Sequence, residues 1–170
     1  TDLLADALIV SDLDAALAQD MGDVELWMLR GNAEEASAAG RGQRGGVASI
    51  AFYERALAVS PGHFGAHHYL IHSFETIASA EDALKHGEIY VKAAPAIPHA
   101  HHMWAHDLRR VGRTQDAIAE FRKADELEEA YYAAEKIVPD LDWHHKHNLD
   151  LLSTSYQHQG QMREAERLMR

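Results

Sequence analysis

Apolar residues recur along this chain at intervals of three and four, the period of an α-helix that buries one face. No segment shows the strict alternation of apolar and polar residues that is typical of a β-strand. Three of the four prolines fall between the periodic segments, and Pro98 opens one, where proline is tolerated. The pattern predicts an all-α protein with helices near residues 2–19, 23–37, 46–59, 63–77, 80–93, 98–111, 114–135, 141–158 and 161–170.

A step of 34 residues recurs through the middle of the chain. It separates Pro61 from Pro95, and it links Ala56, Tyr90 and Ala124 in a series. A repeat of this length contains two helices, and each such hairpin buries its apolar face against its neighbours. The step therefore predicts a stack of similar helical hairpins.

Three segments carry a family resemblance. VELWMLRGNAEEA (24–36), VGRTQDAIAEFRKA (111–124) and HQGQMREAERL (158–168) resemble parts of tetratricopeptide repeats. The resemblance covers roughly residues 24–170 and implies a right-handed solenoid of about four hairpins. It also implies that the first helix of each hairpin lines a concave groove that holds the ligand.

Two insertions interrupt the repeats. The first, near 37–46, contains AAGRGQRGG, whose glycines do not hold a helix well. It is either a plain flexible loop, or a lid or an anion-binding loop. The second lies near 125–140. It is inferred because Gly112 and Gly160 occupy equivalent repeat positions but are 48 residues apart instead of 34. We expect residues 1–170 to form a single helical domain of a longer chain, because the helical pattern reaches both ends.

Composition narrows the classes of partner. There are 16 Lys and Arg against 27 Asp and Glu, which gives a formal net charge of -11. This balance disfavours nucleic acid and anionic membranes, since both need a cationic face. No apolar run approaches the length of a membrane-spanning helix, so no membrane insertion is expected. The chain has no cysteine, which excludes disulfides and thiolate metal ligands.

Histidine is the most informative residue type. Ten of the 13 histidines lie in AHHYLIHSFE (66–75), HAHHMWAH (99–106) and WHHKH (143–147). The 34-residue step maps His67 onto His101, His68 onto His102, and His72 onto His106. The first two clusters therefore occupy equivalent positions of consecutive repeats. His67 and His101 lie one residue off the predicted groove face, so we expect them to pack in the core.

The remaining repeated histidines form two i,i+4 pairs, His68 with His72 and His102 with His106. Such pairs project from one helix face, with Cβ atoms about 6 Å apart. Because neighbouring helices pack about 8–10 Å apart, we expect the four imidazoles to converge. Neutral imidazole is a common ligand of copper, iron and zinc ions. The predicted ligands of one or two such ions are His68, His72, His99, His102, His106 and His147.

Other residues align with this set. At a step of 48, His99 corresponds to His147 and His102 to Asp150. The carboxylate candidates, which would ligate an ion or orient its imidazoles, are Glu35, Glu75 and Asp150. Candidates for binding a substrate or peptide on the same face are Asn32 and Arg109.

The histidine-rich motifs add a narrower resemblance. HHYLIHSFE, PHAHHMWAH and WHHKHNLDLL are similar to a histidine-rich bacterial subgroup of tetratricopeptide-repeat proteins. That subgroup suggests a metal site without naming a reaction, whereas the usual role of the superfamily is to bind peptides or proteins. One version clamps a C-terminal carboxylate with Lys, Arg and Asn, and only Asn32 and Arg109 fit it here.

Several functions stay open on the sequence alone. A metalloenzyme would activate water or dioxygen at an open coordination position, and a metal-binding or sensor protein would close its coordination shell. A peptide- or protein-binding scaffold would hold no metal. The histidines would otherwise serve as solvated polar residues inherited by repeat duplication, or as a pH switch.

Overall fold

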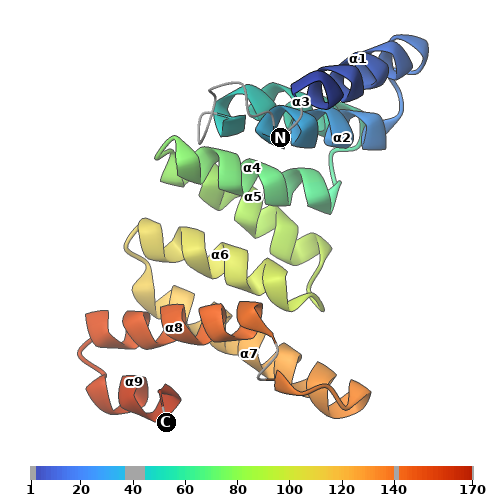
Figure 1. The fold of residues 1–170 in the computed structure, drawn as a ribbon. Helices are drawn as coiled ribbons and strands as arrows, with labels where there is room; N and C mark the ends of the chain where they lie inside the picture. The colour runs from blue at the N-terminus through green and yellow to red at the C-terminus, as the bar shows by residue number, and fades with distance from the viewer. Residues whose placement is uncertain (1–2, 37–44, 140–141, 170) are drawn as a thin grey trace. The chain divides into compact units, whose positions relative to one another are not determined.

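The computed structural model describes residues 3–36, 45–139 and 142–169. Within these ranges the regular structure is α-helical and contains no β-strand. The helices, drawn in Figure 1, are α1 (Leu3–Gln19), α2 (Val24–Ala36), α3 (Gly45–Val59), α4 (Phe64–Thr76), α5 (Ala80–Ala93), α6 (Pro98–Arg110), α7 (Thr114–Glu135), α8 (Trp143–His158) and α9 (Met162–Leu168). Every helix predicted from the apolar period is present. None of the described helices is long and apolar enough to cross a membrane.

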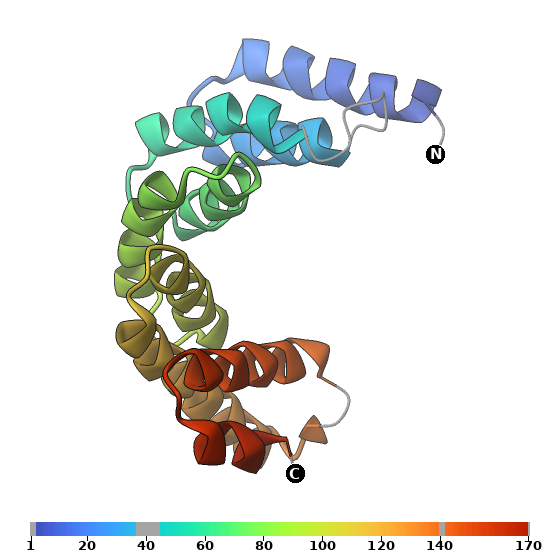
Figure 2. The same cartoon turned by 90° about the vertical axis from the view of Figure 1, so that its left-hand side faces the viewer.

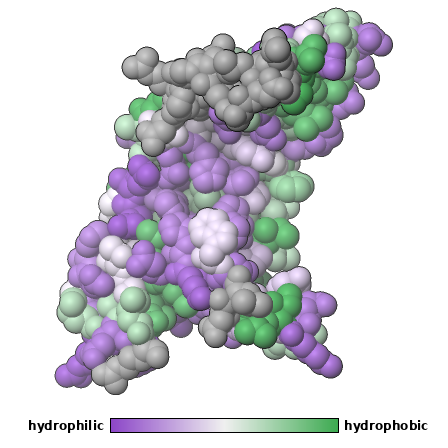
Figure 3. All heavy atoms as spheres, viewed as in Figure 1, coloured by the Kyte–Doolittle hydropathy of each residue, from purple (hydrophilic) through white to green (hydrophobic). Residues whose placement is uncertain are grey.

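The chain divides into two compact units, Thr1–Ile89 and Tyr90–Arg170. In the first unit α1 packs on α2, α2 on α3, and α3 on α4. In the second unit α6 packs on α7, α7 on α8, and α8 on α9. Figure 2 shows these consecutive helices side by side within each unit. Figure 3 shows that hydrophilic side chains cover much of the visible surface of the described helices.

The core of the first unit is built around Tyr53 of α3, which is fully buried. Its ring stacks on Tyr69 of α4 with ring centroids 5.2 Å apart, and its hydroxyl donates to Asn32 Oδ1 of α2 at 2.7 Å. Gly31 makes this close approach of α2 and α3 feasible, because a Cβ there would lie 2.4 Å from the Tyr53 ring. Small and large side chains thus complement each other across the hairpin.

Two turns confirm the step of 48 between the last two hairpins. Gly112 ends the α6 segment with φ +81°, and Gly160 ends the α8 segment with φ +70°. Positive φ favours glycine, which has no Cβ to clash with the backbone. The same turn geometry at the same repeat position shows that α8 and α9 continue the pattern of α6 and α7.

The second insertion lengthens a helix. α7 has 22 residues, whereas its repeat equivalent α5 has 14. The added turns carry Glu128, Glu129, Tyr131 and Tyr132, and α7 ends where Lys136 takes a left-handed conformation. The insertion predicted near 125–140 therefore builds an acidic and aromatic wall beside α8. Most of the insertion predicted near 37–46 lies outside the described residues.

Candidate metal centre and adjoining pocket

His67 and His101 are structural residues, as their position off the groove face predicts. Only 2% of His67 and 8% of His101 is exposed. His67 Nε2 lies 3.0 Å from the carbonyl oxygen of Pro61, and His101 Nε2 lies 3.0 Å from that of Pro95. Each imidazole therefore ties the turn before its helix to the helix itself.

The second ring nitrogen of each packing histidine meets a different partner. His67 Nδ1 lies 2.8 Å from Nδ1 of His86, and burial lowers the pKa of both, that of His86 to about 4. His101 Nδ1 lies 2.6 Å from Oε2 of Glu120, 34 residues after His86. Burial alone would lower the pKa of His101, but the hydrogen bonds to Glu120 and to the Pro95 carbonyl outweigh it and raise that pKa.

Three of the predicted ligands come together in the second unit. His102 and His106 of α6 and His147 of α8 each offer one nitrogen, and these nitrogens lie within 4.8 Å of one another. The centroids of the His106 and His147 rings lie 5.1 Å and 5.1 Å from that of His102, and 5.9 Å from each other. We call this set the histidine trio.

A chain of hydrogen bonds orients His102. Asn148 of α8, fully buried, donates from Nδ2 to the carbonyl oxygen of Phe121 at 2.9 Å. Its Oδ1 therefore faces His102 Nδ1 at 3.0 Å and accepts the proton on that nitrogen. The Nε2 of His102 is left with its lone pair. Metal-ligating histidines use the same device, because a bond at one ring nitrogen fixes the tautomer and exposes the other.

Burial favours the neutral form of two members of the trio, His102 and His147. It lowers the pKa of His102 to about 4, and the neighbouring His106 and His147 lower it further. Burial and His106 also lower the pKa of His147. Neutral imidazoles bind metal ions, whereas imidazolium does not, so both rings are in the ligating form near neutral pH.

The predicted pair of the first unit is also in contact. Nε2 of His72 lies 3.1 Å from Nε2 of His68, and burial together with His72 lowers the pKa of His68 to about 4. Glu75 stands beside the pair, with Oε2 3.8 Å from Nδ1 of His72. The His72 side chain is 48% exposed, so this pair lies nearer to solvent than His102 does.

The other predicted residues have varied surroundings. The His99 ring stacks on His102 with ring centroids 5.5 Å apart. The negative charge of Asp150 opposes the lowering of the pKa of His147 without cancelling it. Arg109 lines a cavity of about 350 Å³ together with His106. Asn32 is bound to Tyr53 as described above.

Glu35 is held inside the first unit. Its Oε1 accepts hydrogen bonds from Ser49 at 2.8 Å and from Ser73 at 3.3 Å. These bonds link α2 to α3 and α4. Both Glu35 and Asn32 thus take part in holding the hairpin together, whatever else they bind.

A second group of metal-competent residues is absent from the prediction. Asp125 and Glu129 of α7 and His145 of α8 have ligand atoms within 4.8 Å of one another. Nε2 of His145 lies 2.8 Å from Asp125 Oδ1 and 3.9 Å from Glu129 Oε1. The i,i+4 spacing of the two carboxylates was a usable signal. It was missed because the 34-residue step pairs Asp125 with Val91, and the added turns that carry Glu129 have no equivalent in α5.

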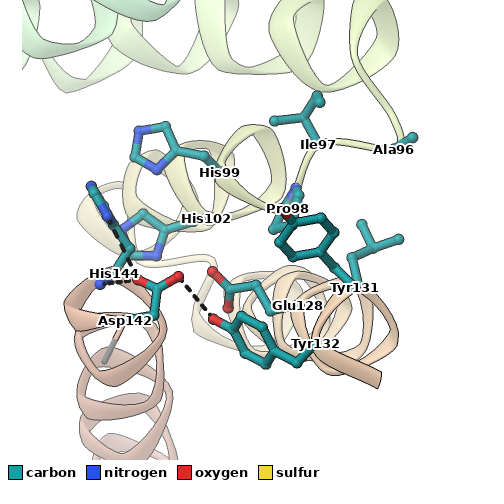
Figure 4. A pocket seen from close by; sticks show the side chains of 11 residues that line it. Ala96, Ile97, Pro98, His99, His102, Glu128, Tyr131, Tyr132, Asp142 and His144 are labelled. Carbon is teal, nitrogen blue, oxygen red and sulfur yellow. Dashed lines mark hydrogen bonds and ion pairs between the residues drawn. The ribbon is translucent and has the colours of Figure 1, made fainter. Parts of the chain in front are cut away.

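A pocket of about 460 Å³ lies next to His102 (Figure 4). α6 and the turn before it contribute Ile97, Pro98 and His99, and α7 contributes Glu128 and the two tyrosines. His144 also lines it and was not among the predicted site residues, although it belongs to the WHHKH cluster. The pocket and the histidine trio share His102.

Comparison with solved structures identifies the architecture. MamA 41-end from Desulfovibrio magneticus RS-1 superposes with a TM-score of 0.73 at 17% identity, covering 94% of this chain and 79% of that one. A MamA AMB-1 structure gives 0.72 at 18%, covering 97% and 86%. TTC0263, described as a thermophilic TPR protein in Thermus thermophilus, gives 0.57 at 16%, covering 75% and 72%. The fold is tetratricopeptide-like.

These likenesses confirm the predicted all-α solenoid class and concern the fold alone. No protein-family model matches the chain, and no curated protein matches its sequence. Any function must therefore be argued from the side chains of this chain.

Proposed function

We propose that this tetratricopeptide-like protein binds a transition-metal ion between His102, His106 and His147. The observation that carries the proposal is the convergence of three imidazole nitrogens within 4.8 Å, one of them from a different helix. The hydrogen-bond chain from Phe121 through Asn148 to His102 supports it, because it sets one ring in the ligating tautomer.

The ligand type favours copper, iron or zinc. These ions accept imidazole readily, whereas magnesium and calcium prefer oxygen ligands. Ligand nitrogens around a tetrahedral zinc lie about 3.4 Å apart, so small rotations of the imidazoles would close the site. Three protein ligands leave a further coordination position open. His99, which stacks on His102, and Asp150, whose charge acts on His147, are the candidates to fill it.

The His68–His72 pair is a second, weaker candidate within the same proposal. Two imidazoles in contact, with Glu75 3.8 Å from His72, offer a chelate of lower denticity than the trio. If metal ions bound at both the histidine trio and the His68–His72 pair, the histidine-rich motifs would be explained as metal ligands. This would agree with their resemblance to a histidine-rich bacterial subgroup of tetratricopeptide-repeat proteins.

Elemental analysis by inductively coupled plasma mass spectrometry tests the proposal. The protein is purified without a histidine tag and reconstituted separately with copper, iron and zinc salts. We expect near-stoichiometric retention of at least one metal. The His106→Ala/His147→Ala variant should lose it, while a matched His68→Ala/His72→Ala variant should retain the greater part.

Two results would contradict this assignment. If no metal binds after reconstitution, the metal proposal fails. If the His68→Ala/His72→Ala variant loses the metal and the other variant keeps it, the main site is the first-unit pair instead. Circular dichroism of both variants checks that the helices persist.

A catalytic role would use the open coordination position. A metal there would activate water or dioxygen, and Arg109, which shares a cavity with His106, would hold an anionic substrate. The expected result is turnover that depends on the metal and weakens in Arg109→Ala without loss of metal.

The fold itself favours a second candidate function, a scaffold that binds a peptide or protein. Stacked helical hairpins of this type form extended binding surfaces, and this role needs no metal. Pull-down from a lysate with wild type and with His106→Ala/His147→Ala separates the two. A partner retained equally by both proteins would assign the binding to the scaffold.

A further inference from the structure

The pocket beside His102 has an acidic floor and apolar walls. Figure 4 shows Glu128 projecting from α7 toward Asp142 and His102, with Tyr131 and Tyr132 beside it. The apolar part of the wall comes from Ile97, Pro98 and Leu127. A volume of about 460 Å³ falls within the range of small-molecule sites, roughly 300–1,000 Å³.

The two carboxylates of this floor differ in what they already bind. Asp142 caps the N-terminus of α8, with Oδ1 accepting from the backbone N–H of His144 at 2.8 Å and of His145 at 3.4 Å. Its Oδ2 accepts from the Tyr132 hydroxyl at 2.9 Å. The hydrogen bonds of Asp142 therefore stabilise the start of α8 and its contact with α7.

Glu128 has no such role. Its Oε2 is buried, and no hydrogen-bond donor among the described residues reaches it. Burial raises the pKa of Glu128 to about 7. His145 opposes this shift, whereas the charges of Asp142, Asp125 and Glu129 add to it. An unfilled acceptor surrounded by negative charge is costly unless something positive joins it.

We propose that this pocket binds a small organic cation, with an ammonium head on Glu128 beside Asp142 and an apolar body against Ile97 and Leu127. The tyrosines add to the selectivity, since aromatic faces attract cations. The apolar wall argues for an organic cation over a bare metal ion, which would prefer oxygen ligands all round. The binding does not require a metal at the histidine trio.

Isothermal titration calorimetry on EDTA-treated protein tests the inference. The probes are 2-phenylethylamine and its neutral isostere 2-phenylethanol. We expect the amine to bind at least about tenfold more tightly than the alcohol, because only the amine forms a charge-assisted hydrogen bond. Glu128→Gln should remove that preference without changing the shape of the pocket.

Glu126→Gln is the matched control. Glu126 lies on the same helix, is 60% exposed and pairs with Lys123 at 3.6 Å, so its loss should leave the preference for the amine intact. Tyr131→Ala, at an exposed position of the wall, should weaken both probes.

Three results would overturn the inference: no binding of the amine at millimolar concentration, equal binding of the alcohol, or an unchanged amine preference in Glu128→Gln. Metal retention by Glu128→Gln is measured in parallel and should equal that of wild type. Failure of the amine site and failure of the metal site are therefore distinguished.

Discussion

The α4–α5 and α6–α7 hairpins use equivalent histidines for different chemistry. In each, a buried imidazole binds the carbonyl of a turn proline, Pro61 or Pro95, so the structural role is shared. The other ring nitrogen meets His86 in the first hairpin and Glu120 in the second. One residue on the following helix decides whether the pKa of the buried ring is lowered or raised.

The two i,i+4 histidine pairs differ for another reason. His68–His72 and His102–His106 have the same spacing on equivalent helices. Within its own unit the second pair gains His147 as a third nitrogen and Asn148 as an orienting partner, both from α8. In the second unit, therefore, α6 supplies an i,i+4 pair and the following hairpin adds a third nitrogen to it.

The largest effect should come from the buried histidines. We expect His101→Ala to lower the free energy of unfolding by about 3 kcal/mol, because it leaves Glu120 and the Pro95 carbonyl without their donor. His67→Ala should cost about 2 kcal/mol, since its second partner is neutral. Urea unfolding followed by circular dichroism measures both.

His72→Ala is the control for this comparison. Its side chain is 48% exposed, so its removal should change the free energy of unfolding by less than about 0.5 kcal/mol. A cost for His72→Ala as large as that for His101→Ala would show that the division into packing and groove histidines is misplaced.

The next effect concerns metal affinity. Asn148→Leu removes the acceptor for His102 Nδ1 but no ligand, and we expect metal binding to weaken by roughly 10- to 100-fold. Competition with a chromophoric chelator measures the change. Asn148→Asp, which keeps an acceptor, should lose less, and equal losses in both variants would argue against orientation of the ring as the cause.

The smallest and most diagnostic effect is the pH dependence of stability. The pKa of His86 is about 4 in the folded protein, against about 6.5 when unfolded. The unfolded chain therefore binds the proton first, and the contribution of His86 to stability falls as the pH drops from about 6.5 toward 4. For His101, whose folded pKa is raised, the contribution is full below about pH 6.5 and is lost as the pH rises.

Unfolding of wild type, His86→Gln and Glu120→Gln at about pH 7.5 and about pH 5 checks these opposite signs. The advantage of wild type over His86→Gln should shrink in acid, and its advantage over Glu120→Gln should grow. His86→Glu, which copies the second hairpin into the first, should reverse the first trend. Parallel trends in all variants would contradict the opposite pKa shifts of His86 and His101.

Much of the fold could be predicted from the sequence. The period of apolar residues predicted the helices, and the 34-residue step placed the histidines on equivalent rungs, because repetition in sequence imposes repetition in packing. The prediction that His67 and His101 pack in the core followed from their spacing on the helix together with the groove face that the family resemblance implies. The contacts of the site residues were harder to predict from the sequence. Asn32 and Glu35 align with groove positions, yet they bind Tyr53, Ser49 and Ser73.

By itself, then, the sequence determined which helices form and which histidines pair within one helix, since both depend on spacing along the chain. Only the tertiary structure decided what crosses between helices. It brought Asn148 to His102, Glu120 to His101, and Glu128 of the lengthened α7 to the pocket. The two hydrogen bonds join residues that are 19 and 46 positions apart in the chain. No sequence spacing predicts such partners, because each contact depends on how neighbouring helices pack.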